Sequence, residues 1–299
     1  MSSPRLPWDR LVRFVSQDSQ RVLYGQPILA DPSDVNKIAE LADAGDLKVK
    51  VFEGDTALTA TPTDKTATVG KLLGPLDGAS VPIVRCIGLN YRTHILETGR
   101  PLPTCPTIFT KPSPSIADHG EDIPIPTIAQ DQCDYEGELV ILIGKDAKNV
   151  PESEALDYVA AYTAGNDVSA RDWQREPNKA GPVPQWTFSK SFDKYAPLGP
   201  CLVAAHMLGS ADNLSLRTIV NGEVRQDTNT SDLCFGVAKL VAFCSQGQTL
   251  QKGSLIMTGT PGGVGLFMKP PAFLKNGDEV VVEVGEIGRL RNRIVFEKG

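Results

Sequence analysis

The chain has 299 residues, of which 41% are hydrophobic, and it carries a formal net charge of −6 at pH 7. This length predicts one large domain, or a large domain with a smaller one attached. The acidic balance argues against binding to nucleic acid or to an anionic membrane surface, and no apolar run is long enough to span a bilayer.

The six cysteines are scattered along the chain and contain no C-x-x-C pair. In a chain of this length the pattern indicates buried, reduced thiols rather than a disulfide framework or a zinc site. The N-terminal residues mix Arg with Asp and lack a long apolar run, so we do not expect a secretory signal. We expect a cytoplasmic protein, with the mitochondrion as the alternative.

Residues 1–76 are predicted to form a small α/β domain. Residues 10–15 and 21–28 are typical of strands, and residues 32–45 of a short capped helix that ends at a glycine. A boundary is expected within residues 76–81, where Gly and Pro punctuate the chain. Residues 77–299 would then form the larger domain.

The larger domain opens with a predicted buried strand at residues 81–89. In the segment that follows, His94 and Glu97 are three residues apart. On a helical turn these side chains share a face, and a carboxylate beside an imidazole raises its basicity, as suits a general base. A short strand at residues 107–111 then delivers Lys111, which would be either a surface charge or a contact for an anionic substrate.

Acidic residues mark the start of the most apolar strand of the chain. Asp134, Glu136 and Glu138 lie two residues apart and run into residues 139–143, which are predicted to be buried on both faces. Alternation along a strand would point the three carboxylates the same way, about 7 Å apart. Like charges there need a cation, and Mg2+ prefers oxygen ligands. Asp167 would close the site; the alternative is a solvated acidic face.

Residues 152–164 place apolar side chains at helical spacing and are predicted to form a helix. The polar segment at residues 165–179 is predicted to be a loop or a short helix. Lys190 lies between aromatic residues, so it would be either a stem packed on apolar bulk or a functional cation.

The last third of the chain is predicted to be rich in strands. An Asn-Gly pair at 221–222 indicates a hairpin, and residues 231–247 an amphipathic helix followed by glycine. A strand at residues 254–258 enters the glycine-rich turn 259–265. This turn lacks the phosphate-binding pattern, and its backbone N–H groups would instead receive a carboxylate. A final hairpin is expected at residues 278–296.

Several segments, taken together, resemble the fumarylacetoacetate hydrolase superfamily over residues 80–297 and, more loosely, over the N-terminal unit. In chain order they are GLNYRTHILE, IFTKPSPSI, DYEGELVILIGK, GNDVSARDWQ, FSKSFDKYAPLGP, VNGEVRQ, TGTPGGVG and FMKPPAFLKNGDEV. The arrangement is most similar to the branch called fumarylacetoacetate hydrolase domain-containing protein 2.

The resemblance implies an α+β, β-rich fold, a mixed β-sandwich roll with a small N-terminal domain. It also implies a homodimer that holds Mg2+, with Mn2+ or Ca2+ as alternatives. Carried over by motif, the metal ligands would be Glu136, Glu138 and Asp167, and Asp134 would be a neighbour outside this set.

The resemblance also implies which residues act on the substrate. His94 and Glu97 would form a base dyad on a mobile lid, and Lys190 would bind or protonate the substrate. Lys111 is a further candidate for substrate contact. The remaining substrate-binding groups would be Arg171, Gln174 and a backbone contact from Thr260.

The activity implied is hydrolysis of a C–C bond in a β-diketo acid such as an acylpyruvate. His94 would activate water, the metal would stabilise the enolate, and Lys190 would supply a proton. Oxaloacetate tautomerase and oxaloacetate decarboxylase are the alternatives, because all three reactions pass through one metal-bound enolate. An alternative from another class is a non-catalytic, metal-binding dimeric scaffold. The expected partner is a small-molecule keto acid, with no nucleic acid and no membrane.

Overall fold

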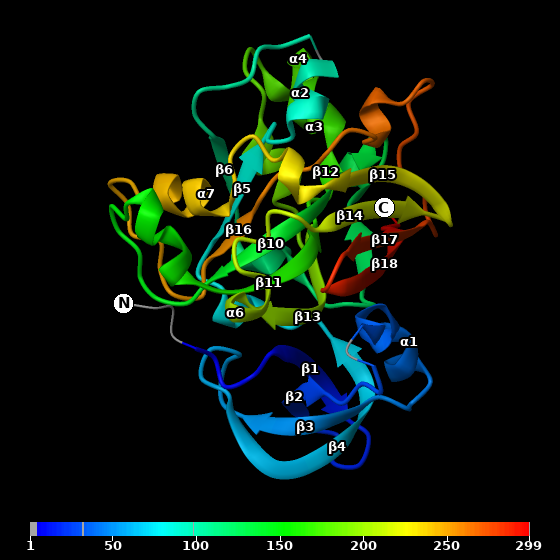
Figure 1. Ribbon diagram of the computed structural model, residues 1–299. Helices are drawn as coiled ribbons and strands as arrows, with labels where there is room; N and C mark the ends of the chain where they lie inside the picture. Colours follow the sequence, from blue (N-terminus) through cyan, green and yellow to red (C-terminus); the bar gives the residue numbers. More distant parts are fainter. Residues whose placement is uncertain (1–4, 32, 98, 299) are drawn as a thin grey trace.

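Strands form the framework of the protein, as Figure 1 shows. The computed structural model describes residues 5–31, 33–97 and 99–298, apart from the Glu97 side chain. Within this part of the chain, the larger sheet has eleven strands, in the order β2-β3-β4-β1-β13-β11-β10-β16-β5-β6, with β7 paired to β13. A second sheet has the order β15-β14-β17-β18-β8, and β12 pairs with β9. Both large sheets contain parallel and antiparallel neighbours, which confirms the predicted β-rich, mixed fold.

The N-terminal strands lie at the lower end of Figure 1, and the two strands predicted first are confirmed. The predicted short helix is a 3₁₀ turn, η1, that continues into α1 and is followed by Gly45 with φ +74°, a conformation that glycine adopts without strain. The elements are β1 (Arg10–Ser16), β2 (Val22–Pro27), η1 (Asp34–Lys37), α1 (Ile38–Asp43), β3 (Lys48–Glu53) and β4 (Thr61–Leu73).

The N-terminal unit joins the rest of the large sheet through β1. β1 pairs with β13 (Ala196–Ala204), where Arg10 faces Val203 and Leu11 faces Leu202. The chain leaves β4 through the 3₁₀ turn η2 (Gly78–Ser80). The proposed division into residues 1–76 and 77–299 stays a prediction.

The centre of the large sheet is β10 (Gly137–Ile143), whose seven residues are all buried. Leu139, Ile141 and Ile143 belong to one hydrophobic core, whereas Val140 and Leu142 belong to another on the opposite face. Each fully buried aliphatic side chain of this kind contributes about 1.5–3 kcal/mol. The strand buried on both faces is therefore confirmed. The other strands of this part are β5 (Val84–Gly88), β6 (Thr107–Lys111), β7 (Ile116–Ala117), β11 (Val159–Asn166) and β16 (Leu255–Met257).

The helix predicted at residues 152–164 is wrong. Residues Glu152–Tyr158 form the 3₁₀ helix η5, and the chain then enters β11, which is buried at every residue. β11 lies between β10 and β13 and is paired with both of them. Pairing with two neighbouring strands therefore overrides the helical spacing.

The predicted hairpins of the last third are confirmed. Asn221 and Gly222 have φ +50° and +82°, as a two-residue hairpin turn requires. The strands are β14 (Ser215–Val220), β15 (Glu223–Asn229), β17 (Glu279–Val284) and β18 (Gly288–Phe296), with β8 (Asp122–Ile125) parallel to β18. The predicted helix at residues 231–247 is the shorter α7 (Val237–Cys244), preceded by the 3₁₀ turn η6 (Thr230–Asp232).

Short helices gather at the upper end of Figure 1, opposite the N-terminal unit. They are α2 (Arg92–Glu97), α3 (Arg171–Arg175) and α4 (Pro177–Ala180). The remaining elements are η3 (Ser113–Ser115), η4 (Thr127–Ala129), β9 (Cys133–Asp134), β12 (Ser169–Ala170), α5 (Trp186–Lys190), α6 (Ala205–Leu208) and η7 (Gly265–Phe267). All six cysteines are free, four of them buried, and Cys105 is exposed.

Candidate active site

Three buried carboxylates come together where β10 begins and β11 ends. One oxygen each from Glu136, Glu138 and Asp167 lies within 4.8 Å of the others. The antiparallel register places Gly137 opposite Asn166, so residues just outside these paired ends become neighbours. The predicted ligand set is therefore assembled in the structure.

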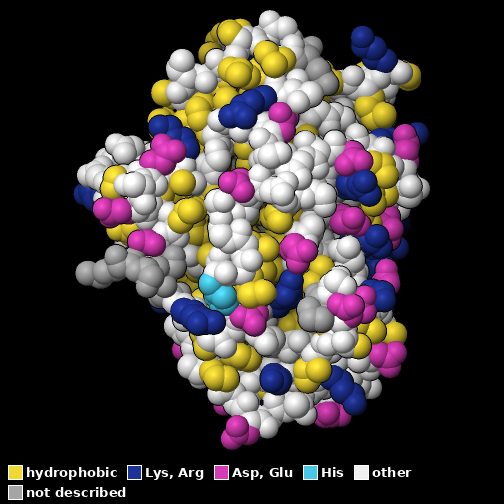
Figure 2. All heavy atoms as spheres, in the orientation of Figure 1, with side chains coloured by type: hydrophobic (Ala, Val, Ile, Leu, Met, Phe, Trp, Pro, Cys, Tyr) yellow, Lys and Arg dark blue, Asp and Glu magenta, His cyan; other side chains and the backbone are white. Residues whose placement is uncertain are grey.

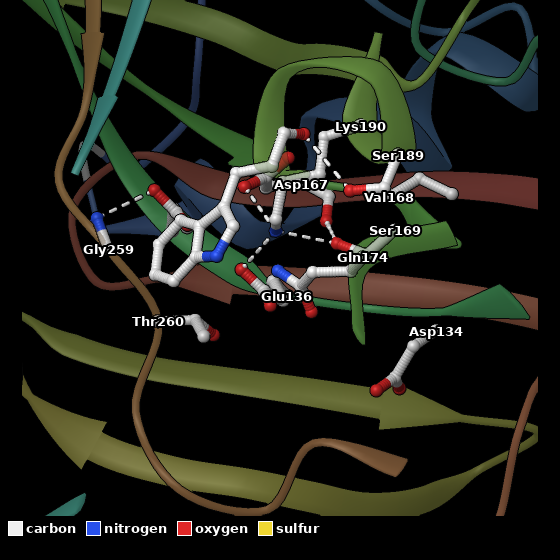
Figure 3. Close-up of polar contacts among 12 residues, drawn as sticks. Asp134, Glu136, Asp167, Val168, Ser169, Gln174, Ser189, Lys190, Gly259 and Thr260 are labelled. Carbon is white, nitrogen blue, oxygen red and sulfur yellow. Dashed lines mark hydrogen bonds and ion pairs between the residues drawn. The ribbon is translucent and has the colours of Figure 1, made fainter. Parts of the chain in front are cut away.

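Asp134 does not join this cluster, contrary to the expectation that its carboxylate points with the other two. The strand is interrupted after β9, and β10 starts only at Gly137, so the alternation does not extend to Asp134. Its carboxylate instead accepts hydrogen bonds from the backbone N–H groups of Gly265 (2.8 Å) and Leu266 (3.1 Å). Figure 3 shows Asp134 apart from the other acidic side chains.

Lys190 is the cation at the centre of the cluster (Figure 3). Its Nζ lies 2.7 Å from Asp167 Oδ2 and 2.9 Å from Glu136 Oε2, and it donates to Ser169 Oγ at 2.6 Å. Burial alone lowers the pKa of an ammonium, but the carboxylates of Asp167 and Glu136 outweigh it and raise the Lys190 pKa. Lys190 is therefore a buried ammonium that stays protonated.

Lys111 is also buried, which excludes the surface alternative. Its Nζ lies 2.6 Å from Asp167 Oδ1 and donates to the carbonyl of Tyr195 at 2.6 Å. It does not belong to the described lining of the cavity that contains the other candidate residues. Contact between Lys111 and a substrate stays a prediction.

Arg171 connects Asp134 to the acidic cluster. Its Nε donates to Asp134 Oδ2 at 2.8 Å, and its Nη1 lies 2.6 Å from Glu136 Oε1 and 3.1 Å from Gln174 Oε1. Burial is outweighed by Glu136 and Asp134, which raise the pKa of the guanidinium. Its buried Nη2 has no hydrogen-bond partner within the described residues.

Backbone N–H groups of the glycine-rich turn after β16 donate hydrogen bonds to carboxylates of the protein itself. Gly259 donates its N–H to Glu138 Oε2 at 2.7 Å. The Thr260 hydroxyl donates to the carbonyl of Gly137 at 3.1 Å and accepts from Gln226 Nε2 at 2.7 Å. Thr260 thus contributes its side chain to the support of β10, and its predicted backbone contact to a substrate stays a prediction.

His94 lies on α2 and faces the cavity. Its side chain is buried, and its ring centroid is 5.8 Å from that of Phe267. The predicted helical turn is confirmed, and Glu97 is its last residue. The Glu97 side chain lies outside the described residues, so the His94–Glu97 dyad stays a prediction.

Six of the predicted site residues line a cavity of about 610 Å³. They form its buried polar surface, and none is more than 9% exposed: His94, Glu136, Arg171, Gln174, Lys190 and Thr260. The rest of the lining includes apolar side chains and exposed cations. The apolar residues are Phe109, Trp186, Val264, Leu266 and Phe267, and the exposed cations are Arg100, Arg175 and Lys269.

The charges beneath the cavity fit a divalent cation. Burial, together with Asp167 and Glu136, raises the pKa of Glu138 well above its usual range. Glu136 is buried as well, but Lys190 and Arg171 hold its pKa below the usual value. Lys111, Lys190 and Arg171 pair with Asp167, Glu136 and Asp134, whereas none of the ion pairs among the described residues includes Glu138. A hard cation with oxygen ligands would supply the positive charge that ionised Glu138 lacks.

Some residues of the site were not identified from the sequence. Ser169 contacts Lys190, and Asn166 accepts a hydrogen bond from the Glu136 backbone N–H at 2.9 Å. Both belong to the segment GNDVSARD, in which only Asp167 and Arg171 attracted attention. Gln226 comes from β15 of the second sheet, and no sequence pattern indicates that it reaches Gly137 and Thr260.

Known proteins resemble the chain over nearly its whole length. The family model described as "Fumarylacetoacetate (FAA) hydrolase C-terminal" matches residues 83–295. The chain is 38% identical over 296 residues to "Oxaloacetate tautomerase fahd2, mitochondrial" of Xenopus laevis, covering 96% of this chain and 90% of that one. It is 39% identical over 301 residues to "Caffeoylpyruvate hydrolase" of Neonothopanus nambi, covering 97% and 94%.

A solved structure, the 2-hydroxyhepta-2,4-diene-1,7-dioate isomerase from Mycobacterium marinum, matches with a TM-score of 0.77 and 31% identity, covering 97% of this chain and 99% of that one. The relatives are named as a tautomerase, a hydrolase and an isomerase, so the fold and its relatives define a family of enzymes. The chain belongs to the fumarylacetoacetate hydrolase family. None of the described helices is long and apolar enough to cross a membrane.

Proposed function

We propose that this enzyme hydrolyses a C–C bond of an acylpyruvate-type β-diketo acid and depends on a divalent metal. The observation that carries the proposal is the buried floor, where Glu136, Glu138 and Asp167 converge beside Lys190. The name of the 39% identical relative, a caffeoylpyruvate hydrolase, supports this class of reaction.

The carboxylates of Glu136, Glu138 and Asp167 would hold Mg2+, with Mn2+ or Ca2+ as alternatives. When bound, such an ion supplies Lewis-acid polarisation of the substrate carbonyl. Arg171 offers its unpartnered Nη2, and Gln174 offers its amide nitrogen, to the carboxylate of the substrate.

His94 would act as the general base, oriented by Glu97. It takes a proton from water, and the resulting hydroxide attacks the carbonyl carbon farther from the substrate carboxylate. The C–C bond between this carbon and the methylene then breaks. Its electron pair leaves as the enolate of pyruvate, which Lys190 protonates on carbon, and the acyl group departs as a carboxylic acid.

Oxaloacetate tautomerase is the second candidate. It requires a proton donor and a proton acceptor but no attacking water, and Lys190, an ammonium beside Glu136 and Asp167, would be the donor. The name of the 38% identical relative favours this reading. Decarboxylation of oxaloacetate is the third candidate reaction for the same residues.

Ultraviolet progress curves with Mg2+ separate these reactions. Acetylpyruvate and oxaloacetate are followed side by side, with pyruvate assayed at the end and EDTA as the control. Pyruvate from acetylpyruvate that EDTA abolishes is the expected result. Loss of oxaloacetate enol without pyruvate would replace hydrolase by tautomerase, and pyruvate from oxaloacetate alone would indicate decarboxylation. No turnover of either acid would favour the metal-binding scaffold.

We also propose that the protein is a homodimer. Figure 2 shows hydrophobic side chains gathered at the end where α2–α4 lie, and the exposed Leu96 is a residue of α2. Exposed apolar patches mark interaction sites. Light scattering on the purified protein, which reports twice the chain mass for a dimer, tests this.

A further inference from the structure

The Phe267 ring lies where three segments of the cavity wall meet. Its centroid is 5.8 Å from that of the His94 imidazole on α2, and the two ring planes are tilted by 55°. On α3, the Arg175 Cζ lies 5.6 Å from the centroid of the same ring. Figure 1 shows the orange segment that contains η7 at the same end of the molecule as α2 and α3. Phe267 therefore joins elements that are far apart in the sequence.

Phe267 contributes little to the folded core. It is 49% exposed, and none of the hydrophobic clusters of the described residues includes it, whereas His94 is only 7% exposed. Burial of apolar surface stabilises a protein in proportion to the area removed from water, so a half-exposed ring adds less than a core residue does. The ring instead lines the cavity and lies against the imidazole. Its replacement should therefore alter the site more than the fold.

The backbone beside Phe267 is held by a buried carboxylate. Asp134 accepts hydrogen bonds from the N–H groups of the two preceding residues, Gly265 at 2.8 Å and Leu266 at 3.1 Å. A side chain at position 265 would place its Cβ 2.7 Å from Asp134 Oδ1, so only glycine lets the chain come this close. The Phe267 N–H donates to the carbonyl of Val264 at 3.1 Å. Asp134 thereby fixes the backbone from which the ring projects.

Another hydrogen bond fixes the start of the same segment. The Tyr135 hydroxyl donates to the carbonyl of Gly263 at 2.8 Å. Tyr135 lies between Asp134 and Glu136, so three consecutive residues hold the segment 263–268 and supply a predicted metal ligand. Because of this arrangement, Phe267 keeps a fixed position relative to the acidic cluster.

The start of α2 is anchored independently of Phe267. The side chain of Asn90 is fully buried and donates to the carbonyl of Thr258 at 2.8 Å. The Thr93 N–H donates to Asp232 Oδ2 at 3.1 Å. These bonds place the first turn of α2, and the aromatic contact lies at the next residue, His94.

We propose that Phe267 is a positioning residue for His94. Its ring holds the imidazole in the orientation from which His94 takes a proton from the attacking water, and Phe267 itself touches no reacting atom. A general base has to lie within hydrogen-bonding distance of that proton, so a small displacement of the imidazole slows the chemical step. This inference rests on the proposed function, which makes His94 the base.

The test is a double-mutant cycle with acetylpyruvate at saturating Mg2+. Steady-state kcat and KM are compared for the wild type, Phe267→Ala, Phe267→Tyr, His94→Gln and the double variant with Phe267→Ala and His94→Gln. The matched control is Met207→Ala on α6, a residue that is 45% exposed and does not belong to the described lining of the cavity. Denaturant unfolding of each variant separates a loss of activity from a loss of the fold.

Phe267→Ala is expected to lower kcat by about 10–100-fold, the range that a misplaced catalytic group allows, and to leave KM nearly unchanged. Phe267→Tyr keeps the ring and should retain most of the wild-type kcat, and Met207→Ala should retain all of it. In the His94→Gln background, Phe267→Ala should cause no further loss, because the two residues act through one group. The effect of a purely structural ring would persist in that background.

A wild-type kcat in Phe267→Ala would overturn the inference. So would the same loss in both backgrounds, since the ring would then act on the substrate or on the fold. If the wild type cleaves no acetylpyruvate, the proposed hydrolysis falls instead. The same cycle is then measured on the loss of oxaloacetate enol, where additive losses overturn the role of Phe267 and non-additive losses support it.

Discussion

Lys111 Nζ lies 2.6 Å from Asp167 Oδ1, and both side chains are almost completely buried. Lys190 contacts the other oxygen of the same carboxylate at 2.7 Å. Asp167 is therefore clamped between a lysine from the β6 strand and a lysine from α5. Since Lys111 is outside the cavity lining, its main effect in this arrangement is to fix Asp167 and to balance its charge.

Replacing Lys111 by Met should lower the free energy of unfolding by about 3–5 kcal/mol, because removing one partner of a buried pair leaves an uncompensated charge. Denaturant unfolding measures this. The matched control is Lys65→Met, which breaks an exposed pair with Glu53 and should cost no more than about 1 kcal/mol. A rise in KM with unchanged stability would instead assign Lys111 to substrate binding.

Asp167→Asn should weaken Mg2+ binding by about 100-fold or more, since mutating even a group that only supports a ligand typically costs about 10–100-fold. Titration calorimetry with the metal alone measures the loss without relying on turnover. Asp64→Asn, at an exposed position of β4, is the control and should bind as the wild type does. Unchanged Mg2+ affinity in Asp167→Asn would refute the ligand assignment.

His94→Gln should reduce acylpyruvate cleavage by about 10²–10⁴-fold, the usual contribution of a general base, and leave Mg2+ affinity intact. Tautomerisation of oxaloacetate should fall less, because it needs no activated water. His206→Gln removes a partly exposed histidine that contacts Asp9 and should not affect turnover. Equal losses in both reactions would argue that His94 acts on the substrate rather than on water.

His119 should make the protein less stable in acid. Burial, with a smaller effect of Arg291, lowers its pKa from 6.5 to about 4, against the opposite effect of Asp43. The unfolded chain then binds a proton between these values and the folded chain does not. The contribution of neutral His119 to the free energy of unfolding is fully present above pH 6.5. It falls by about 3 kcal/mol as the pH falls towards 4.

Urea unfolding of wild type and His119→Asn across pH 4–7.5 measures this contribution. Asn keeps an acceptor near the backbone N–H of Arg291, which donates to His119 Nδ1 at 3.4 Å. The difference between the two pH profiles isolates the histidine from the titrating carboxylates. Parallel profiles would mean that His119 does not titrate on unfolding.

The sequence was sufficient where the signal is local or repeated. The apolar run after Glu138 predicted a strand buried on both faces, and the Asn221-Gly222 pair predicted a hairpin, because each depends on a few consecutive residues. The helix predicted over β11 failed because its environment is set by β10 and β13, which are distant in the sequence.

The same distinction holds for the candidate site. Glu136 and Glu138 were identified by their spacing, and Asp167 as the later acidic residue that would close the site. The resemblance implied the same three residues, and the structure brings them together. The break in the strand before Gly137 separates Asp134 from them, and spacing alone contains no sign of that break. The clamp by Lys111 and the support from Gln226 depend on contacts between strands far apart in the chain, which a single sequence does not reveal.

The pairing of β1 with β13 has a consequence for any attempt to shorten the protein. A fragment beginning at residue 77 would leave Leu202 and Val203 without their partner strand and would present an unsatisfied backbone edge to other molecules. β13 is also the neighbour of β11, which leads directly to Asp167. Such a fragment would aggregate through the free edge of β13, which is one strand away from the candidate site. The measurements above therefore call for the entire chain.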